Sequence, residues 1–350
     1  MDVTQTLALL ATERHLANAD LSGADLSGQD LSNCHFENVR LQAANLSGAN
    51  LSGSAFQGCD FSGARLAQAN LCGSQFMGVT LQKVVLDAAK AAESSWSKAD
   101  FTDAQAAGAD FSNASFDGTV FAATHFSGAT LFKASFHACV LDKVDFAGAD
   151  LTRWTVMDTD LTTVHFARTQ LVQAYLKGCK LSGQRFSGCD LTMTIFNNAD
   201  LRSADFSGTV LDRTSLMGAQ LQQAQMAGVR GHYTALLEAK LVQANLTGAV
   251  FEMADASDAD LSGARCEGSR WHMCVMQRIK AADAGFSHAS LVYCDLSHAD
   301  LPGTDFSRAD LSGANLHAIR GSGTRWDGAQ RGGVRETDEA LARAERWQAA

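Results

Sequence analysis

A large apolar residue recurs at every fifth position of this chain. Residues 17–32 read ANADLSGADLSGQDLS, in which the leucines lie five residues apart. We call each such position a repeat centre. From Leu16 to Trp326 the spacing continues without an insertion that shifts its phase, and most centres are Leu or Phe. A repeat this regular predicts one elongated array rather than two separate domains.

The positions around each centre are also restricted. The residue two before a centre is small, and most of the 30 glycines follow a centre by two. Seven of the nine cysteines occupy the small position: Cys34, Cys59, Cys139, Cys179, Cys189, Cys274 and Cys294. Because no CxxC pair occurs, we expect small core residues with free thiols rather than disulfides or zinc ligands.

A period of five fits neither regular secondary structure. Five residues of α-helix advance about 500°, so the apolar stripe would rotate by about 140° at each repeat. A continuous strand would turn its large apolar residue to the opposite face each time, because five is odd. The chain must therefore turn once per repeat, and the Gly, Asn and Asp residues beside each centre favour such turns.

The motif Ala-[Asp/Asn]-[Leu/Phe]-[Ser/Thr]-Gly, as at 19–23 and 309–313, resembles that of the pentapeptide-repeat family. The resemblance implies an all-β fold, a right-handed quadrilateral parallel β-helix with four repeats in each coil. Residues 16–330 would then form about 16 coils at the parallel-strand spacing of about 4.8 Å. The segment DAAKAAESSW at 87–96 has local helix propensity and could interrupt the coil. Undersized centres include Ala91, Ala106, Ala256, Ala281 and Gly321.

Both ends of such an array need a cover. Residues 1–15 predict an N-terminal capping helix, with Asp2 and Gln5 as a capping box. Its apolar stripe would contain Leu7, Leu10 and Ala11.

Residues 334–350 predict a C-terminal helix, with Leu341, Ala344 and Trp347 on one face. In some family members a C-terminal helix makes a dimer contact, so Leu341 and Trp347 are candidates for either a cap or a dimer contact.

Charge and hydropathy exclude several classes. The formal net charge is −10, which argues against direct nucleic-acid binding. No apolar run approaches the roughly 20 residues of a membrane span. The N-terminus has no basic region before its apolar residues, so we expect no secretory signal and a bacterial cytoplasmic location.

Catalytic and cofactor motifs are not evident. No GxSxG motif occurs, and the clusters RGSG at 320–323 and RGG at 331–333 fall short of a phosphate loop. We therefore expect no enzyme activity, no catalytic residue, no cofactor and no metal. His232, Glu252 and His272 fall in one column, but the two histidines would lie about 9.6 Å apart, too far to share one ion.

The family resemblance implies one specific alternative. Several pentapeptide-repeat proteins bind DNA gyrase by imitating duplex DNA, so this chain could inhibit or protect a topoisomerase. One face carries a column of aspartates: Asp20, Asp60, Asp100, Asp160, Asp200, Asp260 and Asp300. The same face carries basic residues: Arg40, Lys180, Lys240, Lys280 and Arg320. This mixture disfavours the uninterrupted negative potential that DNA mimicry needs.

The preferred interpretation is a rigid scaffold that recognises a protein partner through outward side chains, as an adaptor in assembly or effector delivery. One column breaks the repeat by placing large side chains where Gly is usual: Tyr233, Met253, Met273 and Tyr293. The polar candidates beside it are His232, His272, Arg230 and Arg270. The alternative is that this column only packs on itself or covers the small centres Gly231 and Ala256.

A second face is smooth. It is centred on every twentieth residue from Leu26 to Trp326, and small residues follow most of its centres. The smooth face or the C-terminal helix could therefore form a homodimer contact, or the small residues could simply suit a tight turn.

Overall fold

The computed structural model describes residues 3–345 and contains two compact units, Met1–Tyr175 and Leu176–Ala350. The first unit begins with helix α1 (Val3–Glu13), followed by short strands: β1 (His15–Ala17), β2 (His35–Glu37), β3 (Ala55–Gln57), β4 (Gln75–Met77), β5 (Ser95–Ser97), β6 (Ser115–Asp117), β7 (Ser135–His137) and β8 (Thr155–Val156). The second unit contains β9 (Arg230–His232), β10 (Val250–Glu252), β11 (Arg270–His272) and helix α2 (Glu339–Glu345).

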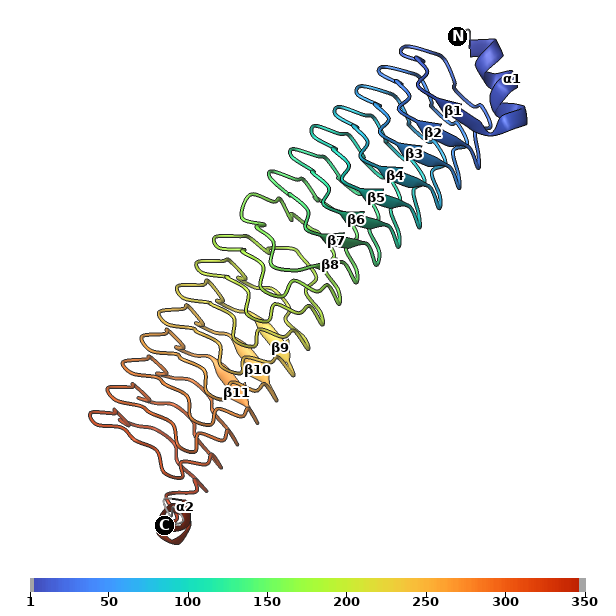
Figure 1. The fold of residues 1–350 in the computed structure, drawn as a ribbon. Helices are drawn as coiled ribbons and strands as arrows, with labels where there is room; N and C mark the ends of the chain where they lie inside the picture. The colour runs from blue at the N-terminus through green and yellow to red at the C-terminus, as the bar shows by residue number, and fades with distance from the viewer. Residues whose placement is uncertain (1–2, 346–350) are drawn as a thin grey trace. The chain divides into compact units, whose positions relative to one another are not determined.

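In the first unit the chain pairs in parallel with itself 20 residues later. Strands β1 to β8 form one sheet in sequence order, and His15 lies opposite His35 at its start. The other sides of the coils make single parallel bridges in the same register, as between Asp20 and Arg40. The Leu21 N–H donates to the Arg40 carbonyl oxygen over 2.8 Å. Figure 1 shows these strands stacked one above another.

The second unit repeats this register. Phe251 in β10 lies opposite Gly231 in β9 and Trp271 in β11. Parallel bridges on the remaining sides continue to the pair Asn315 and Arg335. Each unit is therefore a parallel β-solenoid, and the fold class predicted from the repeat, with short helices at both termini, is confirmed.

The turns explain the motif around each centre. The residue two after a centre has a left-handed backbone, with φ of 68° at Gly23 and 53° at Asn33. The aspartate before a centre closes the same turn, because the Asp20 Oδ1 accepts a hydrogen bond from the Ser22 N–H at 3.0 Å. Glycine, Asn and Asp tolerate these conformations best, so the repeat places them there.

The centres and the small residues two before them form the core. In the first unit the rings stack from coil to coil, with centroids 4.8 Å apart for Phe56 and Phe76 and 3.7 Å apart for Phe76 and Trp96. The Trp96 indole N–H donates to the Ser94 hydroxyl over 2.7 Å. Burial and hydrogen bonding therefore hold the large ring in place together.

Residues 87–96 remain in the coil. The Ala88 N–H donates to the Ala107 carbonyl oxygen at 2.9 Å, and the Ser95 N–H to that of Ser74 at 2.9 Å. Ala91 is fully buried although it is small. The helix propensity of this segment is overridden because the ladder and the core bind it on both sides.

Helix α1 covers the first coil and is shorter than predicted. It ends at Glu13, because Arg14 takes a left-handed backbone with φ of 53° and β1 begins at His15. Leu10 is buried as predicted, but Ala11 is exposed, so its place in the apolar stripe was wrong. The predicted capping residue Asp2 lies outside the described residues.

Helix α2 presents a different face from the one predicted. It begins at Glu339, and Ala342 is its buried residue. Leu341 and Ala344 are exposed, so they do not pack on the last coils, and a dimer contact through Leu341 stays a prediction. Trp347 lies outside the described residues. Neither described helix has the length and hydropathy needed to cross a membrane.

Replacing Trp96 with Ala should destabilise the first unit by about 3–5 kcal/mol, because it leaves a cavity in the ring stack. Urea unfolding of the full chain measures this loss. Met77→Ala is the matched control, because Met77 lies on the exposed side of the neighbouring strand β4. An equal loss of stability in the two variants would contradict the role of the stack.

Candidate binding surface

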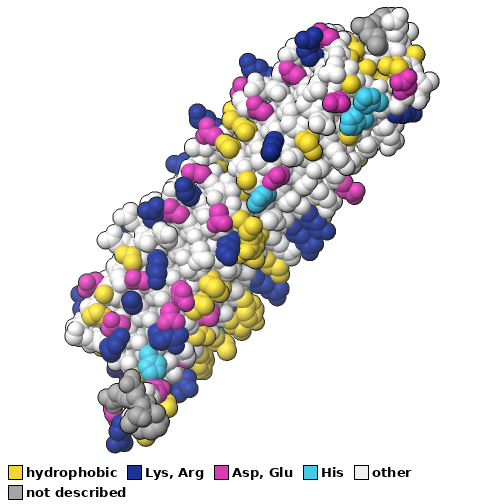
Figure 2. All heavy atoms as spheres, viewed as in Figure 1, with side chains coloured by type: hydrophobic (Ala, Val, Ile, Leu, Met, Phe, Trp, Pro, Cys, Tyr) yellow, Lys and Arg dark blue, Asp and Glu magenta, His cyan; other side chains and the backbone are white. Residues whose placement is uncertain are grey.

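Four large side chains form an exposed column in the second unit, which we call the Tyr–Met column. The exposed fractions are 54% for Tyr233, 43% for Met253, 48% for Met273 and 64% for Tyr293. Backbone hydrogen bonds fix their register, as where the Tyr233 N–H donates to the Glu252 carbonyl oxygen over 3.0 Å. Figure 2 shows hydrophobic side chains gathered along the lower right edge of this unit.

The backbone of the Tyr–Met column is unusual for such large residues. All four have a left-handed backbone, with φ between 51° at Met253 and 58° at Tyr293. Many polar residues adopt this conformation elsewhere in the chain. Among the described residues, however, every Tyr or Met that does so lies in this one column, in which Arg213 separates Met193 from Tyr233. Large apolar side chains at these turns are therefore concentrated on one line of the surface.

Polar side chains border the column as predicted. The His232 Nε2 contacts the Glu252 carboxylate in the next coil. The His272 ring lies 6.3 Å from the Tyr293 ring in an edge-to-face arrangement. Arg230 on β9 is exposed on the strand side of the column. The border therefore carries the positive charge of Arg230 and the carboxylate of Glu252, which is paired with His232.

Core side chains surround Gly231, the small centre at the start of the column. Gly231 is buried, and a Cβ atom built there would lie 3.2 Å from the Phe251 ring. Ala256 is also fully buried. Of the four side chains, Tyr293 covers a neighbouring turn, since its ring lies across Gly313. The space beside Gly231 is therefore occupied by core side chains, and the alternative that the column covers the small centres stays open at Ala256.

The predicted aspartate column is interrupted in both units. In the first unit Asp20 pairs with Arg40 at 2.8 Å. In the second, Asp300 lies 3.8 Å from Arg320. Hydrogen bonds from the side chain and backbone of Ser22, together with Arg40, lower the pKa of the Asp20 carboxyl. These aspartates serve their own turns and pair across coils, so they do not form a continuous negative stripe.

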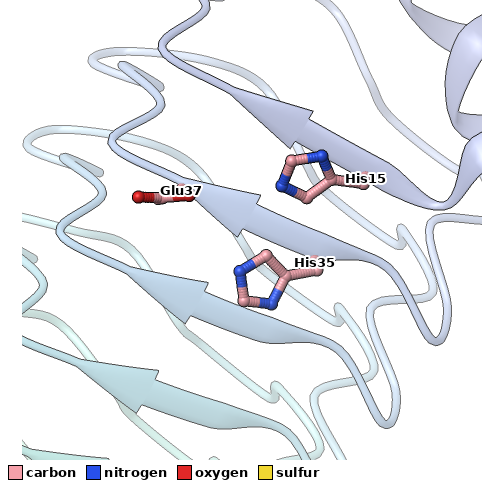
Figure 3. A group of neighbouring side chains, drawn as sticks. All are labelled: His15, His35 and Glu37. Atoms are coloured by element: carbon pink, nitrogen blue, oxygen red, sulfur yellow. The ribbon is translucent and has the colours of Figure 1, made fainter.

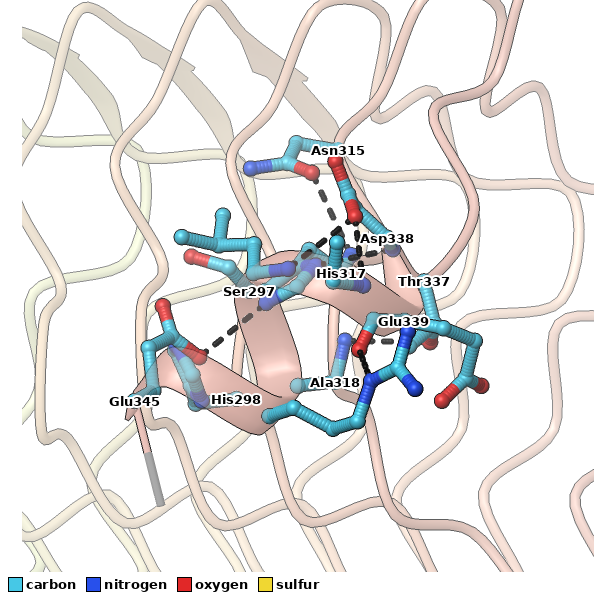
Figure 4. Close-up of polar contacts among 12 residues, drawn as sticks. Ser297, His298, Asn315, His317, Ala318, Thr337, Asp338, Glu339 and Glu345 are labelled. Carbon is cyan, nitrogen blue, oxygen red and sulfur yellow. Dashed lines mark hydrogen bonds and ion pairs between the residues drawn. The ribbon is translucent and has the colours of Figure 1, made fainter. Parts of the chain in front are cut away.

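Helix α2 is fastened to the last coils by a group that we call the cap cluster: His298, His317, Asp338 and Glu345. The Asp338 N–H donates to the His317 Nδ1 at 3.1 Å, and the His317 Nε2 lies 3.1 Å from the Glu345 carboxylate. Asp338 also caps α2, accepting hydrogen bonds from the Ala340 N–H at 2.9 Å and the Leu341 N–H at 3.1 Å. Figure 4 shows these contacts. Sequence reasoning missed the cluster because Glu345 is far from the two histidines along the chain.

Two groups of histidine and glutamate lie close enough to be considered as metal ligands. One is His298, His317 and Glu345, and the other is His15, His35 and Glu37. The column of His232, Glu252 and His272 is not among the groups found in the described residues. The second group could have been found from the sequence, because His15 and His35 are 20 residues, or one coil, apart.

Comparison with known families decides the identity of the fold. Eight segments match the family described as "Pentapeptide repeats", at residues 19–58, 54–90, 85–121, 119–153, 157–192, 194–230, 236–270 and 282–317. The chain belongs to the pentapeptide-repeat family. No match was found among the curated proteins.

Several solved structures of pentapeptide-repeat proteins are similar to this one. HetL, involved in heterocyst differentiation regulation in the cyanobacterium Nostoc, is 20% identical, with 94% of each chain covered and a TM-score of 0.21. Full-length QnrB1, a plasmid-mediated fluoroquinolone resistance protein, is 18% identical over 62% of this chain and 93% of its own, with a TM-score of 0.20. A thylakoid-lumen protein of Arabidopsis thaliana is 24% identical over 37% of this chain and 67% of its own, with a TM-score of 0.18. With scores this low, the family membership rests on the repeats and not on these structures.

The contacts of the cap cluster lead to a prediction about the stability of α2 in this pentapeptide-repeat protein. Asp338→Ala should destabilise α2, because the helix loses its N-cap acceptor. Faster amide exchange in Glu339–Glu345, with β9 to β11 unchanged, measures this effect. Asp338→Asn should restore protection, because Asn is an equally good N-cap. Equal protection in the Ala variant and the parent would refute the role of Asp338.

The lowered aspartate pKa values predict a loss of stability in acid. Hydrogen bonds from Ser307 and the charge of Arg325 outweigh burial and lower the pKa of Asp305 below its unfolded value of about 3.9. Its contribution is therefore present above that pH and is lost as the pH falls through the folded pKa. Asp305→Asn keeps the turn acceptor but loses the ion pair with Arg325, which is worth about 1 kcal/mol or less.

Urea unfolding at a series of pH values tests this prediction. The parent should lose stability below about pH 4. Asp305→Asn should be slightly less stable at pH 7 and should differ less from the parent in acid. Asp327→Asn, at an exposed aspartate of the same unit, is the control. A constant difference between Asp305→Asn and the parent across the pH series would show that the carboxyl does not contribute in this way.

Proposed function

We propose that this pentapeptide-repeat protein is a non-enzymatic scaffold that binds a partner protein through the Tyr–Met column and acts as an adaptor in its assembly or delivery. The observation that carries the proposal is the contiguous exposure of four large side chains at turn positions where the repeat favours Gly. Single exposed apolar residues are common on proteins, but contiguous patches mark interaction sites. Tyr and Met are also enriched at recognition surfaces.

The border of the column indicates the chemistry of the partner. Adjacent coils are about 4.8 Å apart, so the four side chains span about 14 Å. Arg230 and Arg270 are exposed on the strands beside them, while the nearby Glu252 is paired with His232. The surface therefore suits a ridge of apolar side chains on the partner, flanked by a carboxylate that can reach one of the two arginines.

The state of the nucleophilic side chains supports a role without catalysis. Burial raises the pKa of the Cys139 thiol to about 11, so it stays protonated at neutral pH. Serine hydroxyls in the repeats take part in turns, as where the Ser27 hydroxyl donates to Asp25 at 2.7 Å. Side chains used in this way hold the coil together and are poorly placed to attack a substrate.

The alternative from the same family is imitation of duplex DNA to inhibit or protect DNA gyrase. The net charge of −10 favours it. The pairing of aspartates with arginines in the neighbouring coil, as for Asp258 and Arg278 at 2.6 Å, opposes it. We therefore prefer the scaffold. Self-association through the smooth face or through α2 stays a separate prediction.

The double variant Tyr233→Ser, Met273→Ser should weaken partner binding at least tenfold, or about 1.4 kcal/mol, because it removes apolar contact area from the column. Capture from the native cell with the tagged full chain identifies the partner, and titration of the purified pair measures affinity. Met217→Ser is the matched control, since Met217 is exposed on the same unit outside the column.

Two results would overturn the proposal. One is unchanged partner affinity in the folded double variant, which would place the contact elsewhere. The other is inhibition or protection of a topoisomerase together with competition by duplex DNA, which would establish the alternative. The scaffold predicts that supercoiling activity is unaffected by the purified chain.

A further inference from the structure

A second group of side chains, on the first two coils, has the composition of a metal site. His15 in β1 lies directly opposite His35 in β2, and their rings stack with centroids 5.3 Å apart. Glu37 follows His35 by two residues, so it faces the same side of β2. One nitrogen from each ring and one carboxylate oxygen all lie within 4.8 Å of one another. Figure 3 shows the two rings side by side with Glu37 beside them.

The three side chains are held near one another by the backbone. The His35 N–H donates to the Arg14 carbonyl oxygen over 2.7 Å, and the Asn18 N–H donates to that of Glu37 over 2.8 Å. These bonds fix the register of β1 and β2, so that only side-chain rotation is needed to gather the ligand atoms. Zn²⁺ lies about 2.0–2.2 Å from nitrogen and carboxylate ligands, and both histidines are exposed and free to turn toward one ion.

The ligand atoms are also available. Within residues 3–345, neither ring of this pair nor the Glu37 carboxylate has a hydrogen-bond or ion-pair partner. Arg14, which precedes His15, uses its guanidinium elsewhere, since it donates to the Ser32 carbonyl oxygen over 2.9 Å. The polar atoms of the site are therefore satisfied by solvent alone, which an ion can displace.

The other histidine group fails the same test. The His317 Nδ1 accepts a hydrogen bond from the Asp338 N–H, so the proton of the neutral ring is on Nε2. That Nε2 faces the Glu345 carboxylate at 3.1 Å and donates to it. A metal ligand needs a free lone pair on the nitrogen facing the ion, and a metal-bound histidine donates from its other nitrogen. The cap cluster is thus a set of hydrogen bonds that hold α2 on the last coils, and we do not propose it as a metal site.

We propose that His15, His35 and Glu37 bind one divalent transition-metal ion of the zinc class, with water in the remaining position. Two imidazoles and one carboxylate form a known zinc ligand set. The ion would join β1 to β2 beside α1. Because it would bind only the folded arrangement, it would stabilise the first coils by linkage.

Titration of the full chain with Zn²⁺ alone, followed by calorimetry, tests the site. The parent should bind one ion more tightly than His35→Ala by at least tenfold, and Glu37→Gln should show a smaller loss. His137→Ala is the matched control, because His137 is an exposed histidine on β7 of the same sheet. Amide exchange in β1 and β2 should slow when Zn²⁺ is added to the parent and not when it is added to His35→Ala.

Several outcomes would overturn the proposal. Equal Zn²⁺ affinity in the parent and His35→Ala would do so, as would an affinity of the parent weaker than about 1 mM, equivalent to about −4 kcal/mol. Loss of the ion in His298→Ala but not in His35→Ala would place the site at the cap cluster instead. Circular dichroism should show that all variants are folded, since the altered side chains are exposed or lie at the surface.

Discussion

The 20-residue register between coils is the constraint on which the rest of each unit depends. It is set twice, by backbone hydrogen bonds such as that from Leu21 to Arg40 and by rings that stack from coil to coil, such as Phe76 on Trp96. Pairing alone could slip by one residue, but a slip would turn every core residue outward. Because burial and pairing demand the same register, each supports the other. The undersized centre Ala91 is tolerated for this reason.

The same register turns sequence spacing into surface columns. Residues one coil apart are neighbours, so an acid and a base 20 residues apart become an ion pair, as Asp305 and Arg325 do at 2.9 Å. Where the column instead repeats large apolar side chains, the result is a contiguous exposed strip. Ion pairs between coils therefore reduce the net charge that the sequence places on the surface, whereas the large apolar residues at the turns stay exposed. This asymmetry is why the Tyr–Met column supports recognition better than the aspartates support DNA mimicry.

The sequence predicts the repeating part of this fold well and its ends poorly. Each centre is determined by its own five residues, so the core, the left-handed turns and the exposure of Tyr233 follow from the pattern. The helices depend on where they dock. Leu341 was a candidate for a cap or a dimer contact, but the residue that packs on the last coils is Ala342, where the Asp338 N–H also binds His317. A contact between the last coils and Glu345 lies outside any column, so no repeat pattern indicates it.

The histidines of this chain show that lying close together does not by itself make a metal site, because the hydrogen-bond partner of each ring determines what the ring can bind. The His232 ring contacts Glu252 and becomes part of a polar border. Both nitrogens of the His317 ring are hydrogen-bonded, one to the Asp338 N–H and the other to Glu345, so the ring holds α2 on the last coils. The rings of His15 and His35 stack on each other, and both side chains are exposed beside the half-buried Glu37. The hydrogen-bond partners separate them, and they leave the first two coils as the place where an ion can bind.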